Sequence, residues 1–251
     1  MERSVHLHAK VCLVTGSSRG LGRALALDFA RLGASLVINS RSSSMTDLAE
    51  TERQIKGLGA QVLSVYADVS KRADVERLAG EALARFGRVD VLVNNASALG
   101  PTPMPYLADY PIDDFDGVFR TNVTGPFMLT RALVGQMLAR GSGSVINVSS
   151  DAGIVGYPTW GAYGVSKAAL DHLTRTWAAE LDGTGVRINC VDPGDMDTAM
   201  KRASEPDGDP TQWAKPETVT PVFVYLASDQ SAAVNGQRFN AQQFIGEKQP
   251  L

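Results

Sequence analysis

The sequence is poor in the residues that build disulfide frameworks and metal centres. Its 251 residues include only two cysteines and three histidines. Cys12 and Cys190 both fall in apolar runs that read as core strands, so we expect buried free thiols, as in a reducing cytoplasm. Because no cluster of histidine and cysteine exists, a disulfide has little support and we predict no bound metal.

Long apolar runs and blocks of positive charge are also missing. No run approaches the length of a membrane span, and the formal net charge is −3. We therefore expect neither a membrane nor a nucleic acid as a partner. The short segment Met1–Ala9 lacks the apolar core of a signal peptide, which favours a cytoplasmic protein.

What the sequence does have is a repeated alternation of apolar strand-like runs and helical segments. This alternation predicts an α/β fold, a single doubly wound parallel sheet of about seven strands with helices on both faces. The length suits one domain, residues 1–251. The predicted strands are Val11–Val14, Ala34–Asn39, Val62–Ala67, Val89–Val93, Ser144–Ser149, Val186–Val191 and Gln237–Ala241, and the two long predicted helices are Asp113–Arg140 and Tyr163–Leu181.

A glycine-rich turn lies between the first predicted strand and the first predicted helix. In Thr15-Gly16-Ser17-Ser18-Arg19-Gly20-Leu21-Gly22 the three glycines allow a tight turn and a close backbone approach to a ligand. The helix that follows offers free amide groups and the positive end of its dipole to a pyrophosphate. The spacing Gly-x-x-x-Gly-x-Gly is a variant of the dinucleotide fingerprint, so we expect a dinucleotide cofactor.

The end of the second predicted strand bears on which dinucleotide binds. A carboxylate there would bind both adenosine ribose hydroxyls and repel a 2′-phosphate. This chain has Asn39-Ser40-Arg41 instead, and Arg19 adds a second guanidinium nearby. Arginines with small hydroxyl groups suit a phosphate monoester, so we expect NADP(H) in preference to NAD(H). The alternative is that both arginines are solvated surface charges.

A tyrosine and a lysine four residues apart suggest a reaction. On a helix, Tyr163 and Lys167 share one face about a turn apart. An unperturbed phenol has a pKa of about 10, and a neighbouring ammonium would lower this pKa toward a value useful for proton transfer. Taken alone, the pair could equally be two surface residues of an ordinary helix.

Together these motifs resemble the classical short-chain dehydrogenases/reductases over nearly the whole chain. The resemblance implies a Rossmann fold and a ketoreductase-like enzyme, which uses a nicotinamide cofactor to interconvert a small-molecule carbonyl and an alcohol. The matching pieces, in the order of the family, are Thr15-Gly16-x-x-x-Gly20-x-Gly22, Asp68-Val69, Asn94-Asn95-Ala96, Asn122, Ser150, Tyr163-x-x-x-Lys167, and Pro193-Gly194 followed by Thr198.

The resemblance also implies roles for four catalytic residues. Tyr163 would donate a proton to the carbonyl oxygen, and Lys167 would lower the pKa of the phenol and bind the nicotinamide ribose. Ser150, thirteen residues before the tyrosine, would orient the carbonyl, while Ser149 would be a structural hydroxyl. Asn122 would hold a water that relays protons from the lysine toward solvent.

Further cofactor contacts are implied at the carboxyl ends of the strands. Asp68 would bind the adenine amino group, although it could simply cap a turn or a helix. One of Asn94 and Asn95 would tie strands together, and Ser97 stands where family members commonly have glycine. The full predicted cofactor set is Gly16, Ser18, Arg19, Gly20, Leu21, Gly22, Ser40, Arg41, Asp68, Val69, Asn95, Ala96, Tyr163, Lys167, Pro193, Gly194, Met196 and Thr198.

The sequence leaves the substrate open. The pocket is expected between residues 98–107, 151–160 and 196–213, with a polar, breaker-rich lid at about 199–216. An alcohol dehydrogenase working in the oxidising direction is one alternative, and a nucleotide-binding redox sensor without turnover is another. Retention of all four catalytic residues favours an enzyme.

Assembly is implied by resemblance as well. Members of the family commonly form homodimers or homotetramers through the two long helices and the final strand. The apolar residues that could supply this interface, unless they face the sheet, are Phe127, Leu129, Leu133, Leu170, Leu173 and Trp177.

Overall fold

The computed structural model describes residues 6–244, and its strands form one sheet. All seven strands are parallel, in the order β3-β2-β1-β4-β5-β6-β7. The predicted α/β class and strand number are therefore confirmed. The strands are β1 Val11–Val14, β2 Ser35–Ser40, β3 Val62–Tyr66, β4 Val91–Asn94, β5 Gly143–Val148, β6 Val186–Asp192 and β7 Arg238–Asn240.

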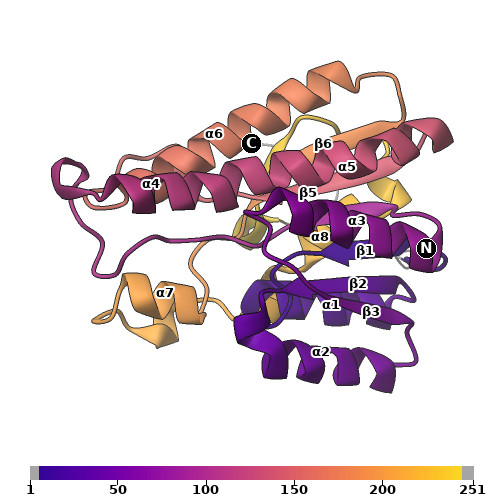
Figure 1. Ribbon diagram of the computed structural model, residues 1–251, viewed down its shortest axis with the longest axis horizontal. Coiled ribbons are helices and arrows are strands. Elements are labelled where there is room, and N and C mark those ends of the chain that lie inside the picture. The colour runs from indigo at the N-terminus through magenta and orange to yellow at the C-terminus, as the bar shows by residue number, and fades with distance from the viewer. Residues whose placement is uncertain (1–5, 245–251) are drawn as a thin grey trace.

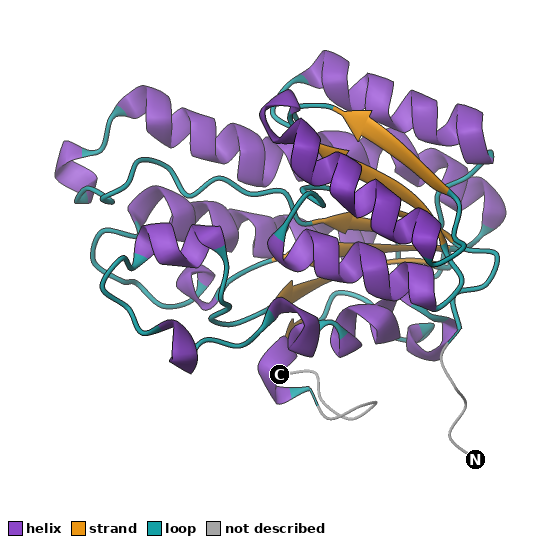
Figure 2. Cartoon of the chain, turned by 90° about the horizontal axis from the view of Figure 1, so that it is seen from below, coloured by secondary structure: helices purple, strands orange, loops and turns teal. Residues whose placement is uncertain are grey.

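Helices cover both faces of the sheet, as Figures 1 and 2 show. One apolar core joins the sheet to α1 (Gly20–Arg31), α2 (Met45–Gly57) and α8 (Pro221–Ala227). A second core joins the opposite face to α3 (Arg72–Phe86) and to the long helices α5 (Gly125–Arg140) and α6 (Gly161–Glu180). Central strands such as β1 and β5 are buried along their whole length, which explains why they read as continuous apolar runs.

The long helix expected at Asp113–Arg140 is divided in the structure. It consists of α4 (Ile112–Phe119), a π-helical segment at Arg120–Thr124, and α5. Pro126 cannot donate a backbone hydrogen bond, and a Cβ built on Gly125 would lie 2.9 Å from the Val69 carbonyl oxygen. The helix thus widens where it crosses the loop after β3, and π segments of this kind are frequent at functional sites.

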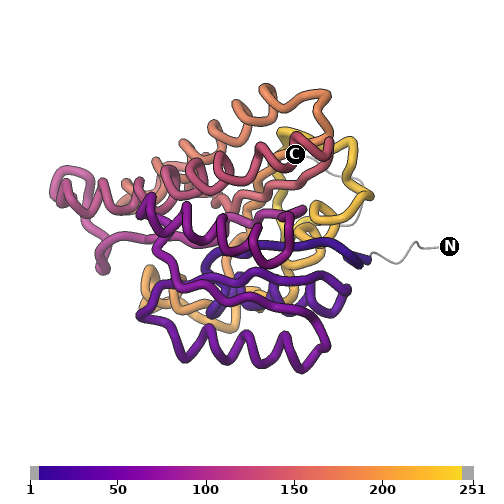
Figure 3. Tube along the Cα trace, turned by 45° about the vertical axis from the view of Figure 1, so that its right-hand side comes forward, coloured from indigo at the N-terminus to yellow at the C-terminus, as the bar shows by residue number. Residues whose placement is uncertain are grey.

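The strand order places a crevice at one end of the sheet. β2 and β4 flank β1 on opposite sides, so the chain reverses direction of winding there. The loops after β1, β4, β5 and β6 all leave the carboxyl end of the sheet, and these loops carry the motifs identified above. α4 and α7 (Ala199–Ser204) project beyond that same end (Figure 1), and the tube trace shows the segment around α4 extending farthest (Figure 3).

Residues 1–5 and 245–251 lie outside the described part of the chain. The prediction that Met1–Ala9 is not a signal peptide therefore concerns mostly residues outside the described part. Within residues 6–244, no helix combines the length and the apolar character needed to cross a membrane.

Candidate active site

The glycine turn after β1 leaves room for a ligand's phosphates. Gly16 and Gly20 adopt positive φ angles of 66° and 54°, which suit glycine far better than other residues. A Cβ on Gly22 would stand 2.3 Å from the Gly16 carbonyl oxygen. The N-cap of α1 is Arg19, whose side chain makes no capping hydrogen bond. The first amides of α1 therefore remain available to an anion, and the turn fits the pyrophosphate of a dinucleotide.

Two asparagines at the end of β4 brace this turn. The side-chain amide of Asn95 donates to the carbonyl oxygens of Thr15 (2.8 Å) and Gly16 (3.2 Å). The Thr15 hydroxyl in return accepts from the amides of Asn95 and Ala96, both at 3.0 Å. Asn94 donates to Asn147 Oδ1 on β5 at 2.8 Å. Both asparagine side chains thus tie strands together, and Asn95 uses its amide group on the turn.

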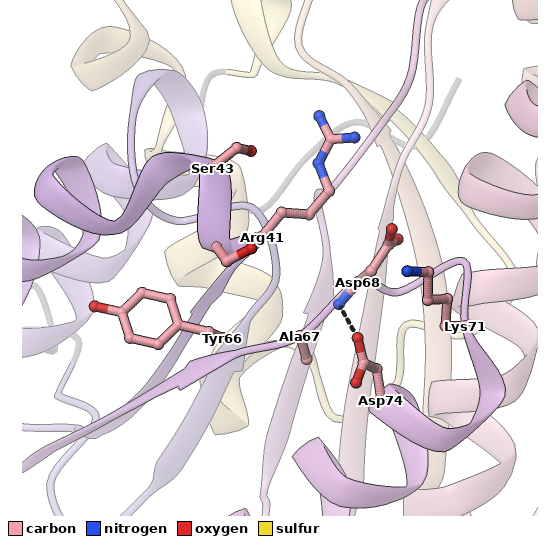
Figure 4. Close-up of a pocket in the computed structure, with 8 residues that line it drawn as sticks. Arg41, Ser43, Tyr66, Ala67, Asp68, Lys71 and Asp74 are labelled. Carbon is pink, nitrogen blue, oxygen red and sulfur yellow. Dashed lines mark hydrogen bonds between the residues drawn. The ribbon is translucent and has the colours of Figure 1, made fainter.

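A hollow at the ends of β2 and β3 lies where the adenosine ribose was predicted (Figure 4). It contains Arg41 as predicted, but its second cation is Lys71 and not the exposed Arg19. The hydroxyl of Ser40 is turned to the Arg41 carbonyl oxygen at 3.1 Å. The hydroxyls in the hollow instead belong to Ser42, Ser43 and Tyr66, and its remaining lining residues are Ala67, Asp68 and Asp74.

The sequence reasoning missed Lys71 and the two serines. The signal was available, because Lys71 follows the Asp68-Val69 motif and the serines follow Arg41 directly. Asp68 lies in the hollow and also closes a turn, since its Oδ1 accepts from the Ser70 amide (3.0 Å) and hydroxyl (2.7 Å). Both alternatives left open for Asp68 are compatible with this position.

The remaining predicted contacts near the glycine turn offer mainly their backbones. Leu21 is buried in the core, and Ser18 is buried within the turn itself. Val69 presents its carbonyl oxygen to the π segment, close to Gly125. Side chains at these positions are therefore structural, and any cofactor contact there would involve the main chain.

Tyr163 and Lys167 face the same side of α6, as predicted. Their side chains are almost fully buried, with 9% and 2% of each residue exposed. The Lys167 ammonium lies 5.3 Å from the centroid of the Tyr163 ring and donates to the Val148 carbonyl oxygen at 2.7 Å. The pair thus stands at the end of β5, beside the crevice.

The pKa values of this pair differ from the sequence-based expectation. Burial raises the pKa of Tyr163 above the ordinary value, and the hydroxyls of Ser150 and Ser97 oppose this effect by hydrogen bonding. Burial also lowers the pKa of Lys167 to about 8, against the influence of Asp171 and Asp192. The net lowering of the phenol pKa that the sequence led us to expect is therefore not found, because desolvation is the largest influence on both groups.

Ser150 is held by its neighbour Asp151. The Ser150 hydroxyl donates to Asp151 Oδ1 at 3.0 Å and accepts from the Ala152 amide at 3.2 Å. The other oxygen of Asp151 accepts from the Tyr157 hydroxyl at 2.8 Å. Ser149 is buried, and its hydroxyl has no hydrogen-bond partner among the described residues. Of the two adjacent serines, Ser150 is the one whose hydroxyl lowers the pKa of the phenol.

Asn122 lies in the π segment with its side chain fully hydrogen-bonded. Its Oδ1 accepts from the Ala98 amide (2.7 Å) and the Ser97 hydroxyl (3.1 Å). Its Nδ2 donates to the Ala98 carbonyl oxygen (2.9 Å) and to Ser166 Oγ (3.0 Å). An amide group has two donor hydrogens, and both are used. A relay water at this residue would have to bind its backbone.

The loop after β6 crosses toward the glycine turn. Gly194 has a φ of 68° and donates its amide to Asp192 Oδ1 at 2.9 Å. A Cβ on Gly20 would be 3.4 Å from Thr198 Cγ2, which places Thr198 over the start of α1. Met196 forms a bridge with Ala214. The predicted carboxamide-binding loop therefore borders the same crevice as Tyr163 and the phosphate turn.

Comparison with known proteins identifies the family of this arrangement. The sequence model described as short chain dehydrogenase matches residues 10–209. The chain belongs to the short-chain dehydrogenase family. It is 35% identical over 241 residues to a 3-oxoacyl-acyl-carrier-protein reductase of Thermotoga maritima, with 93% of this chain and 96% of that protein covered.

Solved structures of similar proteins agree with the fold of this short-chain dehydrogenase. A protein of Shigella flexneri complexed with NADP is 29% identical to this chain, with a TM-score of 0.85. The match covers 95% of this chain and 99% of that protein. A xylitol dehydrogenase with bound NAD+ is also 29% identical, covers 93% and 98%, and has a TM-score of 0.84. This chain is accordingly an oxidoreductase that acts on a carbonyl/alcohol pair.

The segment predicted as a lid lies in a folded loop of the dehydrogenase, residues 195–214. The backbones of Asp195 and Asp197 both hydrogen-bond the backbone of Ala214, which closes the base of this loop. Within it, the buried Lys201 pairs with Asp195 at 2.7 Å and lies 6.0 Å from the centroid of the Trp160 ring. Trp160 in turn contacts the Tyr163 ring, with centroids 5.6 Å apart. The loop is thus linked to the predicted proton donor Tyr163 through the side chains of Lys201 and Trp160. Its action as a lid stays a prediction.

Proposed function

We propose that this short-chain dehydrogenase is an NADP(H)-dependent ketoreductase. The observation that carries the proposal is the convergence of Tyr163, Lys167 and Ser150 at the carboxyl end of the sheet, beside the glycine turn. Reduced nicotinamide, when bound, supplies the hydride for a carbonyl carbon. The first amides of α1 would hold the pyrophosphate, and the Thr198 loop would hold the carboxamide.

The protein's own part is the proton transfer. Tyr163 would donate its proton to the oxygen of the reduced carbonyl, and Ser150 would help to orient this oxygen. Because burial raises the pKa of Tyr163, the phenol keeps its proton at neutral pH. A protonated phenol suits the reducing direction, in which tyrosine acts as the acid.

Lys167 would supply a nearby positive charge. Its pKa of about 8 leaves the ammonium mainly protonated at neutral pH. A charged ammonium near the ring favours the phenolate that forms when Tyr163 gives up its proton. The same group would bind the nicotinamide ribose hydroxyls, as the resemblance implies.

The preference for NADP(H) is supported by the hollow beside Arg41. Replacing Arg41 with aspartate is expected to weaken NADPH binding by roughly 10- to 100-fold, because a charge-assisted hydrogen bond to phosphate is lost and a repelling carboxylate is added. Binding of NADH should change by less than about threefold. Fluorescence titration of both nucleotides measures the two dissociation constants. Arg53→Asp, at an exposed position of α2, is the matched charge control. An unchanged NADPH preference in the Arg41 variant would contradict the assignment.

We also propose a homodimer or homotetramer that uses α5 and α6. Three of the six residues predicted for this interface, Leu129, Leu133 and Leu170, are buried in the protomer. Phe127, by contrast, is 38% exposed and lies beside Trp177, with ring centroids 6.3 Å apart. The change Phe127→Glu is expected to shift gel filtration at micromolar concentration toward a smaller species, since it buries a charge in the interface. A wild-type protein that elutes as a monomer would refute the assembly.

A further inference from the structure

The helix α7 in the loop 195–214 buries a charged side chain instead of an apolar one. Among the described residues of this helix, only Lys201 is buried. Met200, the large apolar residue of the helix, is exposed. A helix with few buried apolar contacts opens locally at a low cost in free energy. The position of α7 must therefore depend on the contacts of Lys201.

Most contacts of the Lys201 ammonium lie within the loop itself. The ammonium pairs with Asp195 at 2.7 Å and with Glu205 at 2.5 Å, and it lies 5.6 Å from the centroid of the Trp213 ring. A Cβ on Gly208 would lie 2.5 Å from the same ring, so the backbone also packs closely against the indole. The loop is thus a compact unit that is able to move without losing these internal contacts.

The base of the loop is attached firmly to the rest of the protein. Met196 and Ala214 pack against the apolar core that contains α1 and α8. The side-chain amide of Gln242 donates to the carbonyl oxygens of Pro193 (3.1 Å) and Asp195 (2.9 Å). Any movement of α7 would therefore pivot about this base.

Trp160 is the partner of the Lys201 ammonium that lies outside the loop. The ammonium is 6.0 Å from the centroid of the Trp160 ring, within the range of a cation–π attraction. The same indole contacts the Tyr163 ring at an interplanar angle of 70° and packs against Leu99 and Ala152. Trp160 therefore joins the loop to the wall of the crevice at the predicted proton donor.

We propose that Lys201 is a positioning residue, whose ammonium holds the loop 195–214 against the Trp160 ring on the substrate side of Tyr163. With this contact formed, α7 stays over the indole. With it broken, the loop opens as a unit about its base, because Asp195, Glu205 and Trp213 move with the ammonium. No bond is made or broken, and the effect on turnover rests on the proposed function of Tyr163.

Replacing Lys201 tests whether its charge holds the loop. Lys201→Met removes the ammonium, and the fold should be retained, since Asp195 and Glu205 are 65% and 42% exposed and water can solvate them. Amide hydrogen exchange of residues 199–204 should become about three- to tenfold faster, as expected for loss of a cation–π contact. Lys201→Arg keeps a cation and should restore the exchange of the wild type.

Two further variants separate this contact from the internal packing of the loop. Trp160→Leu removes only the partner outside the loop and should speed exchange in α7 by a similar factor. Combining it with Lys201→Met should add little, because both changes remove one shared contact. Arg202→Met is the matched control, since it removes the neighbouring cation of α7, which pairs with Asp197 on the surface. Its exchange should stay within about twofold of the wild type.

Turnover provides a second readout, with the carbonyl compound that the wild type reduces best. In Lys201→Met the KM for this compound should rise by about three- to tenfold, because the closed loop is less populated. The value of kcat should change less than KM, and Lys201→Arg should restore both. The dissociation constant for NADPH should stay within about twofold, since the base of the loop is unchanged.

Hydrogen exchange needs neither substrate nor cofactor, so the two proposals can fail separately. Unchanged exchange in Trp160→Leu, or fully additive effects in the double variant, overturns the role of Lys201 even if the enzyme turns over. Faster exchange without a rise in KM overturns it as well. Faster exchange together with a raised KM supports it. Faster exchange in the variants, with no turnover of any carbonyl compound by the wild type, supports the contact and overturns the ketoreductase proposal instead.

Discussion

Tyr163→Phe is expected to lower kcat for carbonyl reduction by roughly 10²- to 10⁴-fold, while the dissociation constant for NADPH stays within about twofold. A positioned acid or base contributes about this much to a rate. Phenylalanine keeps the ring, which packs with Leu99 and Ala152 and contacts Trp160, so the fold should be retained. Loss of NADPH absorbance with a panel of ketones and aldehydes measures turnover, and fluorescence titration measures binding.

A matched control exists on the other side of the sheet. Tyr225 on α8 is as buried as Tyr163, at 8% against 9% exposed, but it belongs to the core with α1. Tyr225→Phe should therefore leave turnover within a few-fold of the wild type. If Tyr163→Phe turned over as fast as this control, the phenol would not be the proton donor. If the wild type bound NADPH tightly but consumed none with any carbonyl compound, this result would favour the redox-sensor alternative.

The largest loss of stability is expected at β7. Arg238 pairs with Asp171 on α6 (3.3 Å) and with Asp192 at the end of β6 (3.1 Å), and the two carboxylates are only 5% and 4% exposed. Arg238→Met would leave both carboxylates buried without their cation. Removing one partner of a buried ion pair costs about 3–5 kcal/mol. Urea denaturation should show this decrease in the free energy of unfolding.

The size of this loss should depend on pH, in a direction set by Asp192. Burial raises the pKa of Asp192, and Arg238 opposes the rise. The folded state therefore binds the Asp192 proton more tightly than the unfolded state does. The resulting contribution to the free energy of unfolding is full below about pH 4 and is lost as pH rises through the pKa of Asp192 in the folded state. Without Arg238 the folded pKa rises further. The gap between variant and wild type should therefore widen from acidic to neutral pH.

Arg202 provides the comparison for this prediction. Its pair with Asp197 lies on the surface, where the side chains are 56% and 33% exposed. Exposed pairs are worth about 0–1 kcal/mol, so Arg202→Met should lower the free energy of unfolding by less than about 1 kcal/mol. An equal effect of the two substitutions, or a gap for Arg238→Met that does not change with pH, would contradict the buried network.

The fold was predictable because its signals are local. Runs such as Val11–Val14 are buried on both faces, so they contain apolar residues without alternation, and β1 has the predicted bounds. The face shared by Tyr163 and Lys167 followed from helical geometry alone. The break in the long helix was not predictable in the same way, since it depends on the approach of Gly125 to the Val69 carbonyl oxygen, a contact between distant segments.

The electrostatics of the site were the weakest part of the prediction. Sequence spacing placed an ammonium near a phenol, but it contained no measure of desolvation, which dominates the pKa of both groups. The contact between Ser97 and Asn122 was equally hidden, because the two residues come from different elements of the fold. Lys71 could have been noticed, since it lies two residues after the recognised Asp68-Val69 motif.

The brace between Asn95 and the loop after β1 bears on how tightly a nucleotide can be held. Four hydrogen bonds fix the loop to β4 without any contribution from a ligand. A binding loop that is already rigid loses little conformational entropy when a ligand binds, so its contacts contribute more fully to the affinity. The dinucleotide-binding side of the site would thus be pre-organised, and any conformational change on binding would occur on the substrate side.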